Sequence, residues 1–339
     1  MAKIKLGISG FGRIGRLTLR ALFQHDHAGL VEIAAINHKP VPIEDLAYLF
    51  KYDSVHRTFP GKVEVDGDTI VINGSPVRVL AQPDPEKLDW KSMGVDIVIE
   101  ATGKYRDKAG AGLHMKAGAK KVIITAPGKD DDCTIVMGVN EEDYDPENHH
   151  ILSCASCTTN CLAPVAKVLQ EEFGIEKGLM TTAHAYTSDQ SILDHTHKDR
   201  RRGRSAALSI VPTTTGAAKA IGRVIPELKG KLNGIALRVP TPDVSIVDFT
   251  AVLGREASAE DINEAMKRWA EGPMKGILSI VTEELVSVDF TGNSSSSLFD
   301  PSQTMVVGNL AKVLSWYDNE WGYSCRVVDL ANAIASRGL

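Results

Sequence analysis

The chain has 339 residues, more than one hydrophobic core usually serves, so its length favours two domains. With 43% hydrophobic and 24% charged residues it has the composition of an ordinary globular protein, and a formal net charge of −5 excludes a general attraction to nucleic acid or to acidic membranes. It shows neither a signal-like apolar start nor a run of about 20 apolar residues, and its five cysteines are an odd number, so we expect a cytoplasmic protein with reduced thiols and no contact with membranes.

The first 150 residues predict a parallel sheet. Residues 3–9 and 31–37 are apolar runs typical of strands, and residues 13–24 between them have the apolar spacing of a helix. Further elements of these two kinds are expected at 95–101, 108–118, 121–125 and 134–139. Such alternation implies parallel strands with helices on both faces. Residues 62–80, with an Asp-Gly and an Asn-Gly pair, are expected to form an inserted antiparallel meander.

A glycine motif, GFGRIG, follows the first strand and opens the first helix. Gly10 permits a tight turn, Gly12 lets the backbone approach a pyrophosphate, and Gly15 lets helix and strand pack closely, while the helix N-terminus offers N–H groups to the anion. The alternative is a glycine-rich turn in an unrelated α/β protein. The strand before the motif and the helix after it favour a dinucleotide site.

The end of the second strand indicates which dinucleotide fits. An acidic residue there binds the ribose 2′-hydroxyl and repels a 2′-phosphate. This chain has Asn37, His38 and Lys39 instead, so nothing repels the phosphate and two side chains could attract it. We therefore expect NADP to be accepted and favoured over NAD. The alternative is that His38 and Lys39 are solvated surface residues.

The segment SCASCTTNC contains Cys154, Cys157 and Cys161. A zinc site is disfavoured because a structural site needs four ligands and the chain has no second cysteine pair. Cys154 falls within a strand and Cys161 one turn into a helix, where buried small residues are expected. Cys157 falls at the junction, where the helix dipole and backbone N–H groups are expected to lower the pKa of its thiol. It is the candidate nucleophile.

A partner for this thiol follows 27 residues later. His184 lies near the end of the strand-like run TTAHAYT, and an intervening helix and return strand could bring it beside Cys157. A Cys–His pair activates the thiol and gives the imidazole a proton to move. A histidine in a strand can also be a buried core residue with satisfied hydrogen bonds.

The second half predicts another kind of sheet. Partial alternation of apolar residues in its strands suits an antiparallel or mixed sheet. These strands are expected at 178–186, 235–239 and 245–253. Ser258 and Asp261 form a capping pattern at the start of a helix over 258–271, and 327–336 also looks helical. Residues 188–204 are polar and basic without periodicity and predict a long ordered loop.

Six motifs together resemble the phosphorylating glyceraldehyde-3-phosphate dehydrogenases. They are GFGRIGR, ASCTTNC, HAYT, PTTTGAAKA, LRVPTP and WYDNEWGYS, in this order over essentially the whole chain. The resemblance implies a Rossmann-type α/β domain over 1–156 and an α+β catalytic domain over 157–320, with a mostly antiparallel or mixed sheet. It also implies that a C-terminal helix over 321–339 packs back on the first domain, and that the protein is a homotetramer.

The resemblance also implies a reaction and the residues that carry it. Cys157 would attack the aldehyde carbon of glyceraldehyde 3-phosphate, His184 would take the hydroxyl proton as hydride leaves, and inorganic phosphate would release 1,3-bisphosphoglycerate from a thioester. Residues implied to bind the two phosphates are Thr187 and Arg238 for the substrate, Ser156, Thr158, Thr215 and Gly216 for inorganic phosphate, and Arg202 near both. Residues implied to bind the cofactor are Gly10, Gly12, Arg13, Ile14, Gly15, Asn37, His38, Lys39, Thr102, Thr125 and Asn319. No metal is implied.

Departures from the family pattern concern the cofactor. Strictly NAD-dependent members have Asn-Asp where this chain has Asn37 and His38, and Leu-Pro where it has His195 and Thr196. Both changes favour NADP and resemble NADP-accepting members of the anabolic or gluconeogenic direction. Ser9 and Pro83 stand where the family usually has Asn and Arg, and we assign neither a role.

Three alternatives stay open. Erythrose-4-phosphate dehydrogenase keeps the cysteine and cofactor fold, although the intact phosphate motifs disfavour it. A non-phosphorylating aldehyde dehydrogenase would need a general base for water, for which no motif is found. An RNA-binding role in the cofactor groove is disfavoured by the net charge, and the basic run 198–204 is better explained as a loop where subunits meet.

Overall fold

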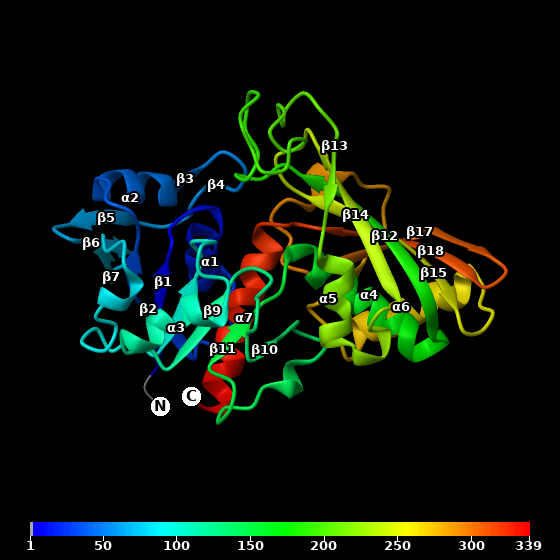
Figure 1. Cartoon of the computed structure of the whole chain (residues 1–339), viewed down its shortest axis with the longest axis horizontal. Coiled ribbons are helices and arrows are strands. Elements are labelled where there is room, and N and C mark those ends of the chain that lie inside the picture. The colour runs from blue at the N-terminus through cyan, green and yellow to red at the C-terminus, as the bar shows by residue number, and fades with distance from the viewer. Residues whose placement is uncertain (1–2) are drawn as a thin grey trace. The chain divides into compact units, whose positions relative to one another are not determined.

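The computed structural model describes residues 3–339, which fold into two compact units (Figure 1). Unit 1 contains residues 3–135, Glu141–Ala155 and Ser324–Leu339. Unit 2 contains Val136–Asn140 and Ser156–Tyr323. Among the described residues no helix combines the length and the apolar character needed to cross a membrane.

Unit 1 is built on a nine-stranded sheet in the order β10-β11-β9-β8-β1-β2-β7-β6-β5. The strands are β1 (Ile4–Ser9), β2 (Val31–Asn37), β5 (Val63–Asp66), β6 (Thr69–Ile72), β7 (Ser75–Leu80), β8 (Ile97–Glu100), β9 (Lys121–Ile124), β10 (Cys133–Thr134) and β11 (Ile151–Ser153). The strands from β10 to β7 pair in parallel, and β6 and β5 extend that sheet as antiparallel strands. Every residue of β8 and β9 is buried, as expected for central parallel strands. The predicted parallel sheet and its meander are confirmed.

The helices of unit 1 connect these strands. They are α1 (Arg13–Gln24), α2 (Ile43–Lys51), α3 (Lys108–Lys116), the short 3-10 helices η1 (Pro85–Lys87) and η2 (Glu141–Asp143), and the part of α7 (Trp321–Arg337) from Ser324 onward. A small hairpin of β3 (Tyr52–Asp53) and β4 (Arg57–Thr58) follows α2. The sequence reading missed α2 and this hairpin.

One predicted strand is much shorter than expected. Residues 134–139 read as an apolar strand, but β10 ends at Thr134. Gly138 has a φ of +79°, and the backbone N–H of Val136 donates to Asn140 Oδ1 at 2.9 Å. These features make a turn, which a count of apolar residues does not detect.

Unit 2 contains a seven-stranded mixed sheet in the order β13-β14-β12-β15-β18-β17-β16. The strands are β12 (Ile175–Ala185), β13 (Val211–Thr214), β14 (Leu232–Val239), β15 (Ser245–Leu253), β16 (Leu278–Ile280), β17 (Ser297–Val307) and β18 (Leu310–Tyr317). Its helices are α4 (Cys157–Phe173), α5 (Ala217–Val224), α6 (Ala259–Glu271), η3 (Pro226–Leu228) and η4 (Ser287–Phe290). Strand β12 pairs in parallel with β14 and antiparallel with β15, so the predicted mixed sheet is confirmed.

Helix α1 is tied to the β3–β4 hairpin by an ion pair. Arg13 Nη1 lies 2.5 Å from Asp53 Oδ2, and Asp53 Oδ1 accepts hydrogen bonds from the backbone N–H groups of Val55 and His56 at 2.9 Å each. Burial raises the pKa of the Asp53 carboxyl, but the His56 amide, the Arg13 guanidinium and the Val55 amide outweigh it and hold this pKa at about 2.

Because the folded protein lowers this pKa, the ionised carboxylate contributes stability above about pH 4 that is lost as the pH falls towards 2. We expect Asp53→Asn to lower the free energy of unfolding at neutral pH by about 2 kcal/mol. The gap between wild type and variant should narrow steadily from pH 5 downward, as measured by urea unfolding at several pH values. A gap that does not change with pH would show that Asp53 stabilises the hairpin without its charge.

Candidate active site

The first turn of α4 presents the thiol predicted as nucleophile. Ser156 caps the helix, with its Oγ accepting a hydrogen bond from the N–H of Thr159 at 3.0 Å. Cys157 is therefore the first helical residue, as expected from the junction of strand and helix. Ala155, two residues before it, has a φ of +55°, a backbone conformation that costs energy for any residue except glycine.

His184 lies beside this thiol. Its Nε2 is 3.4 Å from Cys157 Sγ, and it is the last residue but one of β12, as its position in the sequence predicted. His184 Nδ1 lies 2.7 Å from the carbonyl oxygen of Ala185. The carbonyl of Ala185 can only accept, which favours a proton on Nδ1, whereas Arg238 Nη1 lies 3.0 Å from the same nitrogen and can only donate. With the proton on Nδ1, the lone pair of Nε2 faces the thiol. This is the tautomer that a general base for Cys157 requires.

The protonation states of this pair differ from our expectation for the thiol. Burial raises the pKa of the Cys157 thiol and outweighs the opposing effects of Arg238 and Thr158, so the expected lowering is wrong. Burial and the positive charge of Arg238 lower the pKa of His184 to about 3. A neutral thiol thus faces a neutral imidazole, and Nε2 lies at a distance from which it can accept the thiol proton.

Arg238 brings a cation to the same place. The parallel register of β12 and β14 pairs His184 with Arg238. Arg238 Nη1 donates to the carbonyl oxygen of Ala185 at 3.0 Å and lies 3.4 Å from the hydroxyl of Thr187. The structure thus brings together the two residues predicted to bind the substrate phosphate, and both adjoin the Cys–His pair.

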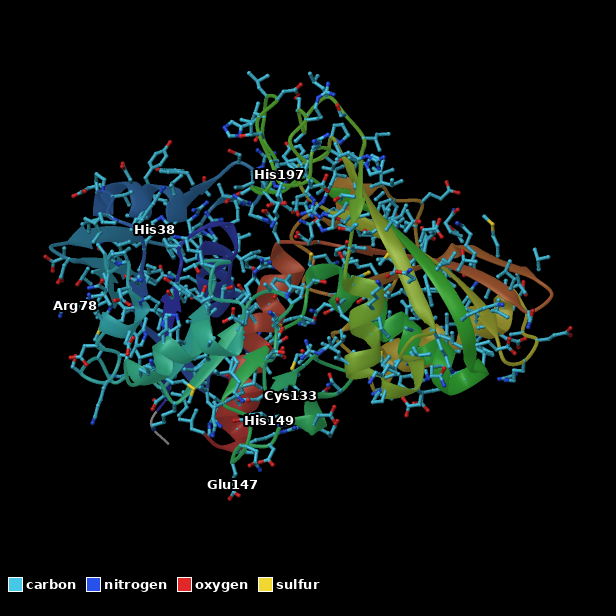
Figure 2. The ribbon with its side chains drawn as sticks, viewed as in Figure 1. His38, Arg78, Cys133, Glu147, His149 and His197 are labelled. Atoms are coloured by element: carbon cyan, nitrogen blue, oxygen red, sulfur yellow. The ribbon has the colours of Figure 1, made fainter. Side chains whose placement is uncertain are left out.

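Arg202 is held at the edge of the same region by a partner that the sequence reading missed. Its Nη1 donates to Asp189 Oδ2 at 2.7 Å, its Nε to Thr213 Oγ1 at 2.9 Å and its Nη2 to the carbonyl of Thr214 at 3.1 Å. His197, labelled in Figure 2, lies 3.5 Å from the other oxygen of Asp189. Asp189 sits in a polar loop without periodicity, so no pattern distinguished it.

Tyr317 is a second residue that sequence reasoning did not assign. Its hydroxyl lies 2.9 Å from Thr158 Oγ1 and 2.9 Å from Thr182 Oγ1, and its ring packs edge-on against His184. Burial raises the pKa of Tyr317 well above 10, so the hydroxyl keeps its proton. The only signal was the motif WYDNEW, in which no role was attached to the tyrosine.

The remaining predicted site residues of unit 2 described by the structure are Thr215, Gly216 and Asn319. Thr215 and Gly216 lie at the N-terminus of α5, where Thr215 Oγ1 accepts from the N–H of Ala217 at 3.2 Å. Asn319 Oδ1 accepts from the hydroxyl of Ser245 at 2.6 Å, which fixes the orientation of the amide. The roles of all three towards phosphate or cofactor stay predictions.

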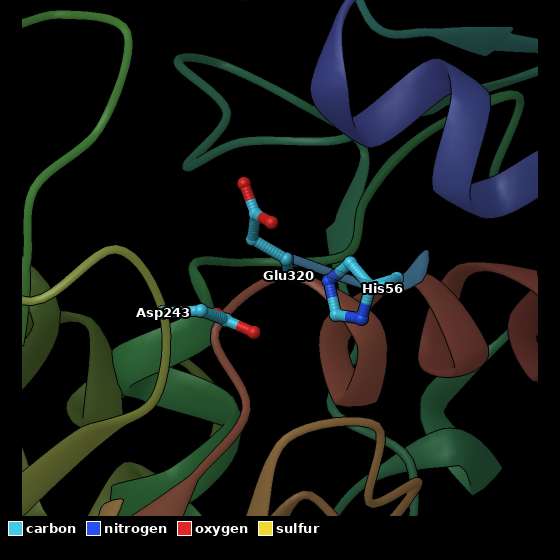
Figure 3. Close-up of side chains that lie close together, drawn as sticks. All are labelled: His56, Asp243 and Glu320. Atoms are coloured by element: carbon cyan, nitrogen blue, oxygen red, sulfur yellow. The ribbon is translucent and has the colours of Figure 1, made fainter. Parts of the chain in front are cut away.

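Near Asn319 the chain gathers acidic side chains. Asp243 lies in the loop before β15, and Glu320 directly precedes α7 (Figure 3). Burial, followed by the charges of Asp318 and Glu320, raises the pKa of Asp243 above its usual range. Asp318 itself accepts hydrogen bonds from the N–H groups of Glu320 and Trp321 and so caps α7. Asp243 is thus held in its protonated form beside these two acids.

The glycine motif in unit 1 borders a cavity of about 270 Å³. Gly10 has a φ of +96°, and a Cβ added there would lie 2.5 Å from the backbone nitrogen of Thr102. A Cβ on Gly15 would lie 2.0 Å from the carbonyl oxygen of Gly10. Both positions therefore require glycine. Predicted cofactor residues that line the cavity are Gly10, Gly12, Asn37, His38, Lys39 and Thr102.

The other predicted cofactor residues of unit 1 lie outside this lining. Arg13 is engaged with Asp53, and Ile14 and Gly15 belong to α1. Thr125 donates through its N–H and its hydroxyl to the carbonyl oxygen of Glu100, at 3.0 and 3.1 Å. Their contacts with the cofactor stay predictions.

The rim after β2 carries less positive charge than the sequence suggested. His38, labelled in Figure 2, accepts a hydrogen bond at Nδ1 from the N–H of Phe11 at 3.3 Å. Burial lowers the pKa of His38, and the charges of Lys39 and Arg16 lower it further, so its imidazole is neutral at pH 7. Asn37 exchanges two hydrogen bonds with the backbone of Gln82, at 2.9 and 3.0 Å. Lys39 is the cation of this rim.

Comparison with known proteins matches both halves of the chain. The family model for the glyceraldehyde 3-phosphate dehydrogenase NAD binding domain matches residues 4–108, and that for the C-terminal domain matches residues 156–319. The chain belongs to the glyceraldehyde 3-phosphate dehydrogenase family. The predicted resemblance is thereby confirmed.

Relatives in this family are similar over nearly the whole chain. "Glyceraldehyde-3-phosphate dehydrogenase" of Geobacillus stearothermophilus and "Glyceraldehyde-3-phosphate dehydrogenase 1" of Bacillus subtilis are each 56% identical, covering 99% of both chains. "Glyceraldehyde-3-phosphate dehydrogenase B, chloroplastic" of Pisum sativum is 54% identical over 99% of this chain and 75% of its own length. The relatives thus include both bacterial and chloroplast proteins.

The Cys–His geometry predicts how the thiol reacts with an alkylating agent. We expect His184→Asn to slow carbamidomethylation of Cys157 by iodoacetamide at pH 7 by about tenfold or more, because the thiol then lacks its base while its pKa stays high. Mass spectrometry of each cysteine peptide gives the rate.

Cys133 serves as an internal control, since it is partly exposed in unit 1 and should react equally in both proteins. Equal rates at Cys157 with and without His184 would show that the imidazole does not activate the thiol.

Proposed function

We propose that this family member catalyses the reversible oxidative phosphorylation of glyceraldehyde 3-phosphate to 1,3-bisphosphoglycerate, with hydride passed to NADP or NAD. The observation that carries the proposal is the approach of Cys157 Sγ to His184 Nε2 at 3.4 Å, with Arg238 and Thr187 alongside. Nucleophile, base and anion site come from one unit. The relatives of 54 to 56% identity named as glyceraldehyde-3-phosphate dehydrogenases support the same activity.

The proposed reaction has two parts: a thioester forms on Cys157, and phosphate then releases the acyl group. Sγ of Cys157 attacks the aldehyde carbon and gives a thiohemiacetal, with the thiol proton moving through Nε2 of His184 to the new hydroxyl. When bound, the nicotinamide supplies the acceptor for the hydride. His184 takes the hydroxyl proton as that hydride leaves, so a thioester forms on Cys157. Phosphate then attacks the thioester carbon, and Sγ leaves and recovers the proton from His184.

Two anions have to be held during this sequence. Arg238 and Thr187 are proposed to bind the substrate phosphate, because a guanidinium and a hydroxyl donor converge there. Ser156, Thr158, Thr215 and Gly216 are proposed to bind the attacking phosphate, with Arg202 contributing charge to both. The effect of the Arg202 charge on the pKa values of His184 and Arg238 supports its nearness to the pair.

The cofactor is proposed to occupy the unit 1 cavity, with NADP favoured. No carboxylate is present at residues 37–39 to bind the ribose 2′-hydroxyl or to repel a 2′-phosphate. Lys39 lines the cavity and adds a positive charge, while His38 offers a neutral N–H at Nε2. The match of residues 4–108 to an NAD binding domain supports a nicotinamide cofactor.

Initial rates test both halves of the proposal. We expect oxidation of glyceraldehyde 3-phosphate to need inorganic phosphate, with kcat/KM greater for NADP than for NAD. His38→Asp should reverse the preference towards NAD by about tenfold or more, since it restores an acid beside the ribose. Oxidation of erythrose 4-phosphate faster than that of glyceraldehyde 3-phosphate, or a rate that does not depend on inorganic phosphate, would contradict the substrate assignment. A clear preference of the wild type for NAD would contradict only the cofactor assignment.

We also propose that the protein self-associates as a homotetramer and that the open face of the unit 2 sheet takes part. The described helices α4, α5 and α6 pack on this sheet, yet Leu179, Ile235 and Leu310 stay 68, 50 and 42% exposed. A hollow of about 910 Å³ there includes Lys177, Asp248 and Lys312 among its lining residues. An apolar surface rimmed by both signs of charge is typical of a self-complementary interface.

Sedimentation velocity tests this surface. We expect Leu179→Asp to shift the protein to smaller species at micromolar concentration, because the carboxylate would be buried without a partner in the interface. Tyr48→Asp is the matched control, since Tyr48 is exposed to a similar extent, at 61%, but lies in α2 of unit 1. Unchanged assembly in Leu179→Asp would exclude this face from the interface.

A further inference from the structure

A buried chain of polar side chains lies behind the cofactor cavity. Trp90, Glu100 and His114 are each at most 2% exposed. Trp90 Nε1 donates to His114 Nδ1 at 3.1 Å, and His114 Nε2 lies 3.0 Å from Glu100 Oε2. Buried polar groups in such a network are stabilising only when every member is paired.

The protons in this network have one consistent arrangement. The indole N–H of Trp90 can only donate, so His114 accepts at Nδ1 and carries its proton on Nε2. That proton points at Glu100 Oε2. Glu100 therefore accepts from the imidazole at Oε2.

The other oxygen of Glu100 holds the wall of the cavity. Glu100 Oε1 accepts from the backbone N–H of Thr102 at 2.8 Å and also from the Thr102 hydroxyl. That hydroxyl accepts from the N–H of Lys104 at 3.1 Å, which leaves its own proton for Glu100. Thr102, Lys104 and Tyr105 line the cavity, and the ring of Tyr105 packs edge-on against His114.

This wall is the segment that adjoins the glycine motif. The backbone of Ala101 and Thr102 fills the space that a side chain at Gly10 would need, since a Cβ at that position would lie 2.5 Å from the Thr102 nitrogen. The N–H of Ala101 donates to the carbonyl of Ser9 at 2.7 Å. A shift of residues 101–105 would therefore change the turn at Gly10, to which the cofactor phosphates are assigned.

We propose that Glu100 is a positioning residue for the cofactor: its carboxylate, oriented by His114 and Trp90, holds residues 101–105 against Gly10 in the shape that the dinucleotide needs. Glu100 does not line the cavity and acts through Thr102. The inference rests on the proposed binding of the cofactor in this cavity. It adds to the reaction a residue that the glycine motif does not reveal.

The hydrogen-bond pattern supplies a precise test. Trp90 and Thr102, at the two ends of the chain of bonds, are both fixed donors, so Glu100 has to accept at both oxygens. Glu100→Gln brings an NH2 group into the network. In every combination of the glutamine orientation and the His114 tautomer, two hydrogen-bond donors then face each other without an acceptor. Trp90→Phe removes the donor at the far end, so His114 can change tautomer and accept from the glutamine.

We expect Glu100→Gln to raise the cofactor Kd and KM by about tenfold, with kcat at saturating cofactor and the KM for glyceraldehyde 3-phosphate little changed. The double variant Trp90→Phe with Glu100→Gln should recover cofactor binding to within about threefold of the wild type, although its Tm is the lowest of the set because a buried ring has become smaller. Isothermal titration calorimetry gives the Kd without depending on tryptophan fluorescence.

Lys121→Met is the matched control for loss of stability alone. Lys121 is fully buried in β9 of the same unit and donates to the carbonyl oxygens of Pro146 and His149 at 2.5 and 2.8 Å. It should lower the Tm without changing the cofactor Kd. This separates positioning from general destabilisation.

Three results decide between the possibilities. A weaker cofactor Kd in Glu100→Gln that the double variant recovers supports the inference. A wild-type Kd in Glu100→Gln, or a loss of affinity that follows the Tm across all variants, overturns it while the proposed function stands. If the wild type binds neither NADP nor NAD, the proposed function fails and the inference fails with it.

Discussion

The proposed chemistry of this chain depends on a thiol and an imidazole held 3.4 Å apart inside the fold. Burial keeps both groups neutral, since it raises the pKa of Cys157 and lowers that of His184. The proton is therefore transferred during the reaction and does not stabilise a permanent ion pair. Local contacts hold this arrangement: the cap at Ser156 starts α4 at the thiol, and the carbonyl of Ala185 and the guanidinium of Arg238 both contact Nδ1 of His184.

Positive charge is the second component of the site. It comes from Arg238 and Arg202, and strand pairing and loop contacts place these two side chains. Pairing of β12 with β14 sets Arg238 beside His184, whereas Arg202 is held by Asp189 and the strand after the basic loop. Arg238 has opposite effects on the catalytic pair: its charge favours the thiolate and disfavours the imidazolium. An anion bound at Arg238 would weaken both effects. With the substrate phosphate bound at Arg238, as proposed, substrate binding and proton transfer would be coupled through one guanidinium.

In unit 1 the controlling constraint is steric. Gly10 and Gly15 leave no space for a Cβ, so the glycine turn, α1 and the segment after β8 fit together closely. Residues 101–105 are held by the bond of Ala101 to Ser9 and by the bonds of Glu100 to Thr102, and Glu100 is in turn contacted by the buried His114, which Trp90 contacts. A polar network behind an apolar sheet is costly when it is incomplete, which makes it well suited to specify one geometry.

Much of this could be predicted from local patterns. Apolar periodicity predicted the parallel sheet, glycine spacing predicted the turn at Gly10 that borders the cavity, and the strand-to-helix junction predicted that Cys157 starts α4. These features depend on neighbouring residues and on the geometry of one element. Tertiary structure alone decided the rest. The pKa of Cys157 rises because burial outweighs the effect of the helix terminus. His38 is neutral because it is buried near Lys39 and Arg16. Tyr317 joins the site through contacts with residues far away in the chain, and Asp189 joins it from an irregular loop. Burial and long-range contacts depend on many residues that are distant in the sequence, and no local sequence pattern reveals them.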